Sequence, residues 1–592
     1  METSDQSISR RTILKAGAAA GATTLVSGVP LPGYAATPGK KVAIFGGGMA
    51  GLTVAHELVE RGFAVTVYEP TAWGGKARSI GVKGSGTGGR KDLPGEHGFR
   101  FFPGFYHHVP DSMRRTPFGN NENGVWDNLV SAQNGKFLRG GDHLDAFLFG
   151  IGPDPEALLN VNGLRKYLTE NLKGQNVPPD ELAYFVTRLL VFLTSSDERR
   201  FGEWENVPWW NFVGADTRSP DYQKVLAAGL TRNLVAAKET VASTRTIGTM
   251  GEAFVYTIAG LGADGGIDRV LDLPTNEAWI NPWVKELKKL GVKFVAGRRL
   301  AKYDVKGGRI AAAWVADASG ERTRVTADWF VSAMPVEQAR KYLTKDVLKL
   351  DGSLEGLNRL KTDWMTGIQF FLREPVNLVK GHITFIDSPW ALTALTQAAF
   401  WSEVDFAKTY GNGSVKDCLS VDISNWDAPG MLYGKPAKRC SPKQVALEVL
   451  AQIRYHKTFG DLLPNKLIHS WFLDPGIHWN PETKRSTNAT PLLINTAGSW
   501  KDRPDAATDI PNLFLAGDFV RTNIDLATME GANESGRMAA NAILESAGST
   551  AAPAALFKLW KNPVLAPLQQ TDAVLYKAGL RNALDLPLKG RF

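Results

Sequence analysis

Hydrophobic and polar positions follow one another in a diagnostic order near the start of the chain. An apolar run, Val42–Phe45, leads directly into the glycine pattern Gly46-x-Gly48-x-x-Gly51. The next residues, Leu52 to Arg61, carry apolar side chains at helical spacing. A second β-branched run, Val65–Tyr68, then ends at Glu69. The pattern predicts a strand, a glycine turn, a helix and a second strand that closes on an acid.

This order of elements is typical of a dinucleotide-binding βαβ unit. The glycines permit a tight turn and a close backbone approach to a pyrophosphate, with Met49 and Ala50 at the start of the helix. The N-terminus of the helix offers free N–H groups to the anion. Glu69 is placed to accept hydrogen bonds from the ribose hydroxyls. A second match, Gly260–Gly265, is not followed by a strand that ends in an acid, so we interpret it as a loop and expect no second nucleotide domain.

A similar transition from strand to glycine occurs near the other end of the chain. The apolar run Leu513–Ala516 leads into Gly517 and Asp518. A helix of small residues is predicted from Thr528 and Met529, through Ala532, to about Glu545.

Between these ends the pattern predicts further pieces of an α/β domain and several connections. A helix is expected over Asn281–Leu290 and a strand over Val292–Val295. Arg309–Val315 and Arg324–Val331 are expected to form a hairpin, and Ser79–Gly95 a flexible glycine-rich loop. His107 and His108 are expected to point to opposite sides of a strand. Near the end of the chain, the segments Leu556–Lys561 and Ala573–Leu580 are short, basic and amphipathic.

Bulk composition narrows the class of protein without deciding it. The chain has 592 residues, too many for one core, so at least two domains are expected. It is 43% hydrophobic and 22% charged, which is ordinary for a globular protein. The net charge of +8 lies in no dense Lys/Arg tract, so nothing favours a nucleic-acid partner. The two cysteines, Cys418 and Cys440, form no metal-binding spacing, and we expect no metal site.

The first 36 residues resemble a twin-arginine export signal. Arg10 and Arg11 precede a weakly apolar stretch, Ala16–Val29, and Gly33–Ala35 supplies small residues for cleavage. The stretch is shorter than the roughly 20 apolar residues that span a bilayer. The resemblance implies export of a folded, cofactor-loaded protein; the alternative is a basic tail with an alanine-rich helix.

The segment Gly74-Gly75-Lys76-Ala77-Arg78 follows the acid and is similar to the GG-x-x-R extension of two-dinucleotide-binding-domain flavoproteins. Residues Glu96–Tyr106 and Ala527–Ala532 resemble the phytoene desaturase and hydroxysqualene dehydroxylase-like branch of the flavin amine oxidase superfamily. Arg100 stands where that branch often has His, which puts any role carried over to this position in doubt.

The resemblance implies an α/β fold with a discontinuous Rossmann-type FAD domain and a mixed α+β substrate domain. FAD is expected to be noncovalent, because no Cys lies near the C-terminal motif. It would be held by Gly46, Gly48, Met49, Ala50, Gly51, Glu69, Gly74, Gly75, Arg78, Val295, Gly517, Asp518, Thr528, Met529 and Ala532. The predicted divisions are the signal at 1–36, the FAD domain at 37–115, 266–335 and 496–547, the substrate domain at 116–265 and 336–495, and a tail at 548–592.

The implied activity is removal of hydride from an apolar isoprenoid or lipid to form a C=C bond. No catalytic side chain is assigned, because the flavin can perform the hard step. The side chains expected to line the substrate slot are Arg100, Phe101, Phe102, Phe105 and Tyr106. A flavin amine oxidase that forms peroxide and a flavin-dependent double-bond isomerase stay open as alternatives. Oxygen or a quinone would accept the electrons. The basic pieces of the tail are expected to pack on the parent domain, with contact to a membrane surface as the alternative.

Overall fold

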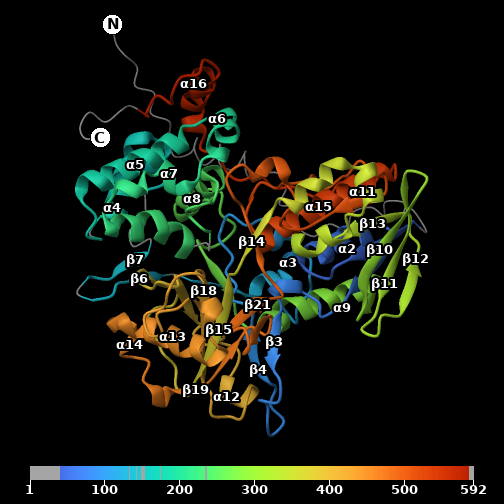
Figure 1. Ribbon diagram of the computed structural model, residues 1–592, viewed down its shortest axis with the longest axis horizontal. Coiled ribbons are helices and arrows are strands. Elements are labelled where there is room, and N and C mark those ends of the chain that lie inside the picture. Colours follow the sequence, from blue (N-terminus) through green and yellow to red (C-terminus); the bar gives the residue numbers. More distant parts are fainter. Residues whose placement is uncertain are drawn as a thin grey trace.

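The computed structural model describes residues 40–585, apart from residues 133, 142, 149–153, 174 and 234–236. The proposed export signal at 1–36 therefore lies outside the described residues. Figure 1 shows two sheets side by side, with a group of helices packed above one of them. None of the described helices is both long enough and apolar enough to cross a bilayer.

A five-stranded parallel sheet joins three distant parts of the chain. Its strands lie in the order β23 (Leu513–Leu515), β13 (Trp329–Ser332), β1 (Lys41–Phe45), β2 (Ala64–Glu69) and β9 (Lys293–Ala296). Helices α2 (Met49–Val59) and α15 (Met529–Ser546) pack against each other beside this sheet, and α9 (Asn281–Lys289) lies near β9 (Figure 1). The predicted α/β fold with a discontinuous Rossmann-type domain is confirmed.

Strand β1 lies in the middle of this sheet, and its last four residues are all apolar and buried. A strand covered by helices on both faces loses the alternation of apolar and polar positions. Val42, Ile44 and Phe45 each expose no more than 1% of their surface, in a core shared with β13, β23 and α15. The two ends of the chain therefore share one hydrophobic core.

The second sheet has seven strands and belongs to the predicted substrate domain. Their order is β19 (Ile468–Leu473), β15 (Thr366–Leu372), β18 (Asp417–Ile423), β17 (Leu392–Thr396), β16 (Ile383–Phe385), β6 (Gly135–Leu138) and β7 (Ala146–Leu148). All neighbours are antiparallel except β16 and β6. Helix α13 (Pro442–Tyr455) covers one face of this sheet, at the lower left of Figure 1.

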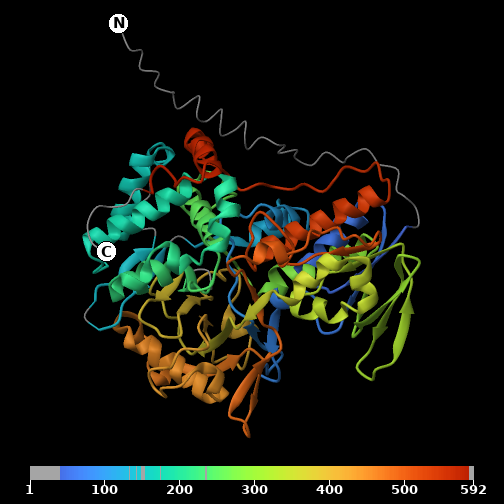
Figure 2. The ribbon, with the colours of Figure 1, turned by 45° about the horizontal axis from the view of Figure 1, so that its top comes forward.

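A cluster of helices forms a third packing unit with its own core. It comprises α4 (Val161–Leu172), α5 (Pro179–Leu193), α6 (Asp197–Gly202), α7 (Trp209–Phe212) and α8 (Thr244–Ile258). The C-terminal helix α16 (Ala566–Lys577) lies on α6, as Figure 2 shows. Asp572 on α16 is buried and accepts a hydrogen bond from the Arg199 Nε–H at 2.9 Å. The tail is therefore anchored to the body of the protein.

Several sequence-based elements were wrong. The predicted strand Arg324–Val331 is two strands: β12 (Arg322–Val325) pairs with β11 (Arg309–Ala316), whereas β13 joins the parallel sheet. The physical reason is that β13 is buried throughout, while three of the four β12 residues are exposed.

The segment Ser79–Gly95 is likewise not a loop throughout. Strands β3 (Ser79–Val82) and β4 (Leu93–Glu96) form an antiparallel pair, because all four β4 residues are buried. His108 begins helix α3 (His108–Arg114) instead of lying on a strand. In the tail, residues 556–561 have no helix, and the amphipathic helix is α16, which begins before the predicted Ala573.

Candidate functional site

The first glycine turn has the close packing that its motif predicts. Gly46 has φ +115°, and a Cβ atom added there would lie 2.4 Å from the carbonyl oxygen of Ala333. A Cβ on Gly51 would lie 1.9 Å from the Gly46 carbonyl oxygen. Because no side chain fits at these distances, the turn between β1 and α2 is accessible only to glycine.

The N-terminus of α2 is buried and lacks a side-chain cap. Its N-cap residue is Gly48, which provides no hydrogen-bond acceptor to the amides of the first turn. Met49 and Ala50 expose only 6% and 4% of their surface. Buried helix N-termini need a partner for their N–H groups, and the helix dipole favours an anion. The residues present therefore fit a phosphate group.

Glu69 closes β2 beside this turn. Its side chain is buried, and Oε2 accepts a hydrogen bond from the Gly47 N–H at 2.9 Å. Oε1 accepts from the Thr71 N–H at 2.9 Å and from its hydroxyl at 2.7 Å. In the neighbouring strand, Val295 pairs with Tyr68, so its backbone lies at the same end of the sheet. The carboxylate is thus fixed at the position where the motif predicts a ribose.

The second glycine pair lies directly against the first turn. The Gly74 N–H donates to the Gly47 carbonyl at 2.8 Å, and a Cβ on Gly75 would come within 2.9 Å of the Gly48 Cα. Gly74 and Gly75 both have positive φ, +96° and +58°. Arg78 donates to the Gly75 carbonyl at 2.6 Å. The two motifs therefore build one continuous glycine-lined surface.

The C-terminal motif follows β23, the edge strand of the same sheet. Strand β23 leads to Gly517, with φ +151°, and to Asp518. Thr528 caps α15, because its hydroxyl accepts the Gly531 N–H at 3.0 Å. Burial raises the pKa of the Asp518 carboxyl, and the nearby charge of Lys76 opposes that effect. Met529 and Ala532 lie in the first turn of α15.

Glu530 was missed by sequence reasoning and joins α15 to α3. Its carboxylate accepts the backbone N–H groups of His107 and His108, each at 2.7 Å, and that of Val109 at 2.8 Å. His108 Nδ1 lies 2.8 Å from the same carboxylate. Burial would raise the pKa of Glu530, but His108 and the backbone N–H groups outweigh burial and lower it. A charged cap thus fixes the start of α3 against α15.

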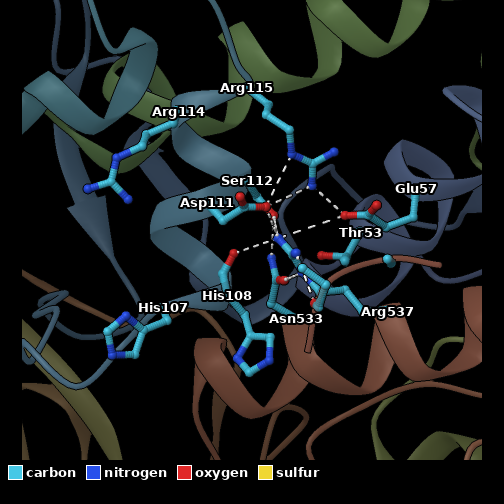
Figure 3. Close-up of polar contacts among 12 residues, drawn as sticks. Thr53, Glu57, His107, His108, Asp111, Ser112, Arg114, Arg115, Asn533 and Arg537 are labelled. Atoms are coloured by element: carbon cyan, nitrogen blue, oxygen red, sulfur yellow. Dashed lines mark hydrogen bonds and ion pairs between the residues drawn. The ribbon is translucent and has the colours of Figure 1, made fainter. Parts of the chain in front are cut away.

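A buried arginine cluster, shown in Figure 3, connects α15, α3 and α2. Arg537 is 1% exposed and donates to Asp111 at 2.6 Å and to the Ser112 hydroxyl and the His108 carbonyl, each at 2.9 Å. Arg115 completes the cluster with an ion pair to Glu57 on α2. The helix behind the first glycine turn and the helix behind the C-terminal motif are therefore locked together.

The loop before α15 is held by a second buried arginine. Arg503 donates to the backbone carbonyls of Asp518 at 2.7 Å, Phe519 at 2.9 Å and Val520 at 2.6 Å, and it pairs with the Asp525 carboxylate. No local sequence signal identifies such a residue, because its partners are backbone carbonyls of a loop whose path depends on the fold.

Comparison with known proteins shows the family to which the chain belongs. The profile of the family described as flavin containing amine oxidoreductase matches residues 49–544. The chain belongs to this family. It is therefore a flavin-dependent oxidoreductase.

Curated relatives and solved structures agree with this assignment. The chain is 23% identical over 534 residues to zeta-carotene desaturase of Synechocystis, covering 85% of this chain and 97% of that protein. It is 22% identical over 279 residues to the carotenoid phi-ring synthase of Chlorobaculum tepidum, covering 47% and 40% of the two chains. Its fold is similar to that of an oxidoreductase from Methanosarcina mazei, with a TM-score of 0.53 and 12% identity over 85% of this chain and 100% of that one. It is also similar to that of a putrescine oxidase variant, with a TM-score of 0.54 and 10% identity over 86% of this chain and 99% of that one.

An apolar pocket lies beside the N-terminus of α15. It includes Leu526 and Ala527, which directly precede the α15 cap. Lys238 is the one charged residue in its lining, and its ammonium group lies 3.4 Å from the Asp363 carboxylate. The other lining residues are Ala237, Val241, Ala242, Thr246, Ile247, Met365, Leu492, Leu493, Ile494 and Asn495.

A second pocket is aromatic and includes one of the predicted slot residues, Arg100. That side chain is anchored, since it donates to the Lys76 carbonyl at 2.6 Å and to the Gly98 carbonyl at 2.6 Å. The pocket lies between this arginine and the seven-stranded sheet, and its aromatic lining comprises Phe99, Phe400 and Trp401.

The other predicted slot residues lie deeper or nearby. Phe102 is fully buried and packs edge-to-face on Trp279, and Phe105 packs likewise on Phe254. Phe101 is partly buried, with its ring 5.2 Å from that of His382. Tyr106 is buried beside Thr528, at the start of α15, and burial raises the pKa of its hydroxyl. Their contact with substrate stays a prediction.

Proposed function

We propose that this oxidoreductase holds FAD noncovalently and removes two hydrogens from an apolar isoprenoid or lipid to form a C=C bond. The observation that carries the proposal is the apolar pocket whose lining includes Ala527, one residue before the cap of α15. The carotenoid enzymes among the relatives support the same class of substrate.

The contacts described above suggest which residues would hold each part of FAD. The α2 N-terminus would bind the pyrophosphate, together with Arg78, and Glu69 would accept the ribose hydroxyls. The backbone of Val295 would contact the adenine. Asp518 would lie at the ribityl chain or pyrophosphate, and the α15 N-terminus would face the pyrimidine carbonyl.

Noncovalent attachment is supported by the cysteines. Cys418 and Cys440 are both free thiols with 0% exposure. Burial raises the pKa of the Cys418 thiol well above its usual value, which disfavours the reactive thiolate.

When bound, the flavin accepts a hydride from carbon. The protein then has to orient the substrate, exclude water and stabilise developing positive charge. The aliphatic pocket excludes water. Holding the substrate in the reactive orientation can lower the barrier by up to about 7–11 kcal/mol. Aromatic rings such as Phe99 and Phe101 contribute about 0.5–2 kcal/mol each toward a cation.

The pocket argues against amines as substrates. Its lining is aliphatic apart from Lys238, which is paired with Asp363, and burying a protonated amine among apolar side chains is costly. A neutral hydrocarbon pays no such cost.

We propose that the protein is exported and passes its electrons to a membrane quinone or to oxygen. The proposal rests on the twin-arginine resemblance of residues 1–36. Helix α16 supplies a surface suited to lipid contact, since Val574 is 68% and Leu568 39% exposed near Lys577.

The test is to incubate purified protein with polyenes, fatty acids and amines and to identify the products by mass spectrometry. The proposal expects a polyene product that is lighter by two hydrogens, without ammonia. Ammonia and peroxide from an amine would contradict it, and so would double-bond migration without loss of hydrogen.

A further inference from the structure

The two faces of the seven-stranded sheet differ sharply in chemistry. Alternate residues of β18 such as Leu419 and Val421 face the core shared with α13. The intervening residues, Ser420 and Asp422, face the other way, toward the segment that follows β4. Gln369 of β15 lies opposite Ser420 and donates to the Glu96 carbonyl at 3.1 Å. This second face, the polar face, therefore meets the flavin domain.

Buried polar atoms without a hydrogen-bond partner gather along this interface. They include Asp422 Oδ1 on β18 and the hydroxyl of Thr384 on β16. Thr384 is completely buried. A buried polar atom without a partner costs roughly 1–3 kcal/mol, so such a group indicates a ligand or a function.

Asp422 lies directly against the backbone that carries Arg100. A Cβ added to Gly98 would be 2.6 Å from Asp422 Oδ1, and one added to Gly367 would be 2.9 Å away. Two glycines thus make room for this carboxyl group. The Arg100 side chain donates hydrogen bonds to the carbonyls of Lys76 and Ala77. The segment Gly98–Arg100 therefore lies between Asp422 and the loop Gly74–Arg78.

The charged groups that face Asp422 come from several elements. Arg100 and His382 favour its charged form, and Glu96 on β4 opposes it. His382 forms an ion pair with Asp268, and its ring is 5.3 Å from that of Phe99. The rings of the aromatic pocket therefore lie next to an acid and an imidazole.

We propose that Asp422 is the proton acceptor of the desaturation step. This inference rests on the proposed function. A hydride, with its two electrons, leaves one substrate carbon and reduces the flavin. The neighbouring carbon loses a proton to the Asp422 carboxylate, and the electrons of that C–H bond form the new C=C bond. The proton then passes to solvent, and the reduced flavin is reoxidised by oxygen or a quinone.

The electrostatics of the site suit this role. Burial raises the pKa of Asp422 to about 7, with Arg100 and His382 acting in the opposite direction. General bases work best when their pKa lies near the working pH. Positive charge that develops on the substrate would stabilise the carboxylate, so the acid is most strongly ionised when the base is needed.

The first experiment needs no substrate. Infrared difference spectra of the FAD-loaded protein are recorded between about pH 5 and about pH 9, a range that spans the titration of a raised carboxyl. The proposal expects a protonated carboxyl band that disappears near pH 7 in the wild type and is absent in Asp422→Asn. Asp417→Asn is the matched control, because Asp417 is a buried acid on the same strand whose side chain belongs to the opposite face. A band that Asp422→Asn leaves unchanged would overturn the proposal.

The second experiment measures anaerobic flavin bleaching by the polyene that the wild type oxidises. Asp422→Asn should slow bleaching by about 10²–10⁴-fold, the usual contribution of general acid–base catalysis. The wild-type rate should rise with pH to a plateau above about pH 7, because the base must be deprotonated. Asp417→Asn should keep both the rate and the profile.

Three outcomes separate the two proposals. Equal bleaching by wild type and Asp422→Asn would overturn the role of Asp422 and leave the desaturase function standing. A flat wild-type pH profile would do the same without relying on any variant. If no polyene bleaches the wild type, the desaturase function is contradicted, and the role of Asp422 is contradicted with it.

Discussion

The two sheets of this protein differ in the groups that they offer to a ligand: backbone atoms in one sheet and side chains in the other. The parallel sheet is buried throughout its central strands, and its functional atoms are backbone amides and carbonyls at the ends of β1 and β2. The mixed sheet packs an apolar face against α13, and its other face carries Asp422 and Thr384 with unpaired atoms beside buried apolar residues such as Phe371. One sheet is complete as a scaffold for a nucleotide, whereas the other leaves polar groups for chemistry.

The comparison explains why the two regions constrain sequence so differently. A glycine turn that binds a phosphate requires specific residue types at fixed local spacing. A polar sheet face requires only that a few side chains from separate strands converge. The nucleotide half can thus be recognised by motif, whereas the substrate half can be recognised only from its geometry.

The largest expected effect comes from breaking the parallel sheet's glycine turn with Gly51→Ala. The new Cβ would lie 1.9 Å from the Gly46 carbonyl, so the turn has to open. The opened turn would no longer present its N–H groups to a phosphate, so the purified variant should carry no bound flavin. Absorption at the flavin wavelengths measures it. Gly251→Ala, where nothing lies within 4 Å of the added Cβ, should keep full flavin content. Full occupancy in Gly51→Ala would show that the turn does not bind the cofactor.

Arg537→Ala tests whether the helices behind the two flavin motifs are locked to one another. It removes a buried cation and leaves Asp111 and nearby Glu57 without a partner on α15. Breaking a buried ion pair costs about 3–5 kcal/mol, which thermal denaturation would detect. Arg114→Ala is the control, because its ion pair with Asp264 is partly exposed and should contribute at most about 1 kcal/mol. Equal destabilisation by the two variants would contradict the role of the cluster.

A smaller effect is expected from Glu69→Gln. The carboxylate accepts three hydrogen bonds from Gly47 and Thr71, and an amide offers only one oxygen. FAD affinity should weaken by about 1–3 kcal/mol, the cost of unpaired buried donors. Titration of the apoprotein with FAD gives the value. The exposed Glu321→Gln should bind FAD like the wild type; a tight-binding Glu69→Gln would place the ribose elsewhere.

The smallest effect concerns the mixed sheet and the stability of Asp422→Asn. The pKa of Asp422 is raised to about 7 in the folded protein, above its unfolded value near 3.9. Its neutral form therefore contributes fully below about pH 4, and that contribution is lost as pH rises through about 7. Asp422→Asn removes the penalty of ionising this carboxyl, so its melting temperature should exceed that of the wild type by more at about pH 8 than at about pH 5. A difference that is the same at pH 5 and pH 8 would contradict the raised pKa.

Much of the parallel sheet could be predicted from the sequence because its signals are local. The run from Val42 to Glu69 specifies strand, turn, helix and strand within 28 residues, and the structure has these elements with boundaries shifted by a few residues. Errors arose where burial, a property of the whole fold, decides the element. Trp329–Ser332 leaves the predicted hairpin because its side chains enter the core, and Leu93–Glu96 pairs for the same reason.

The candidate site was only partly predictable for a related reason. Glu530 meets His108 across 422 positions of sequence, and no local pattern announces this contact. Asp422 was not predicted either, because a lone acid in a strand has the same local signature on a solvent face as beside a flavin. Its neighbours Gly98 and Gly367 become informative only when the fold brings them together.

The most direct test of the central claim is anaerobic titration of the purified, flavin-loaded full chain with a polyene, followed by its absorption spectrum. The account predicts a yellow protein whose flavin bands bleach on adding the polyene and return when oxygen or a quinone is admitted. A flavin that no polyene bleaches but an amine does, or a protein that takes up no flavin, would contradict it.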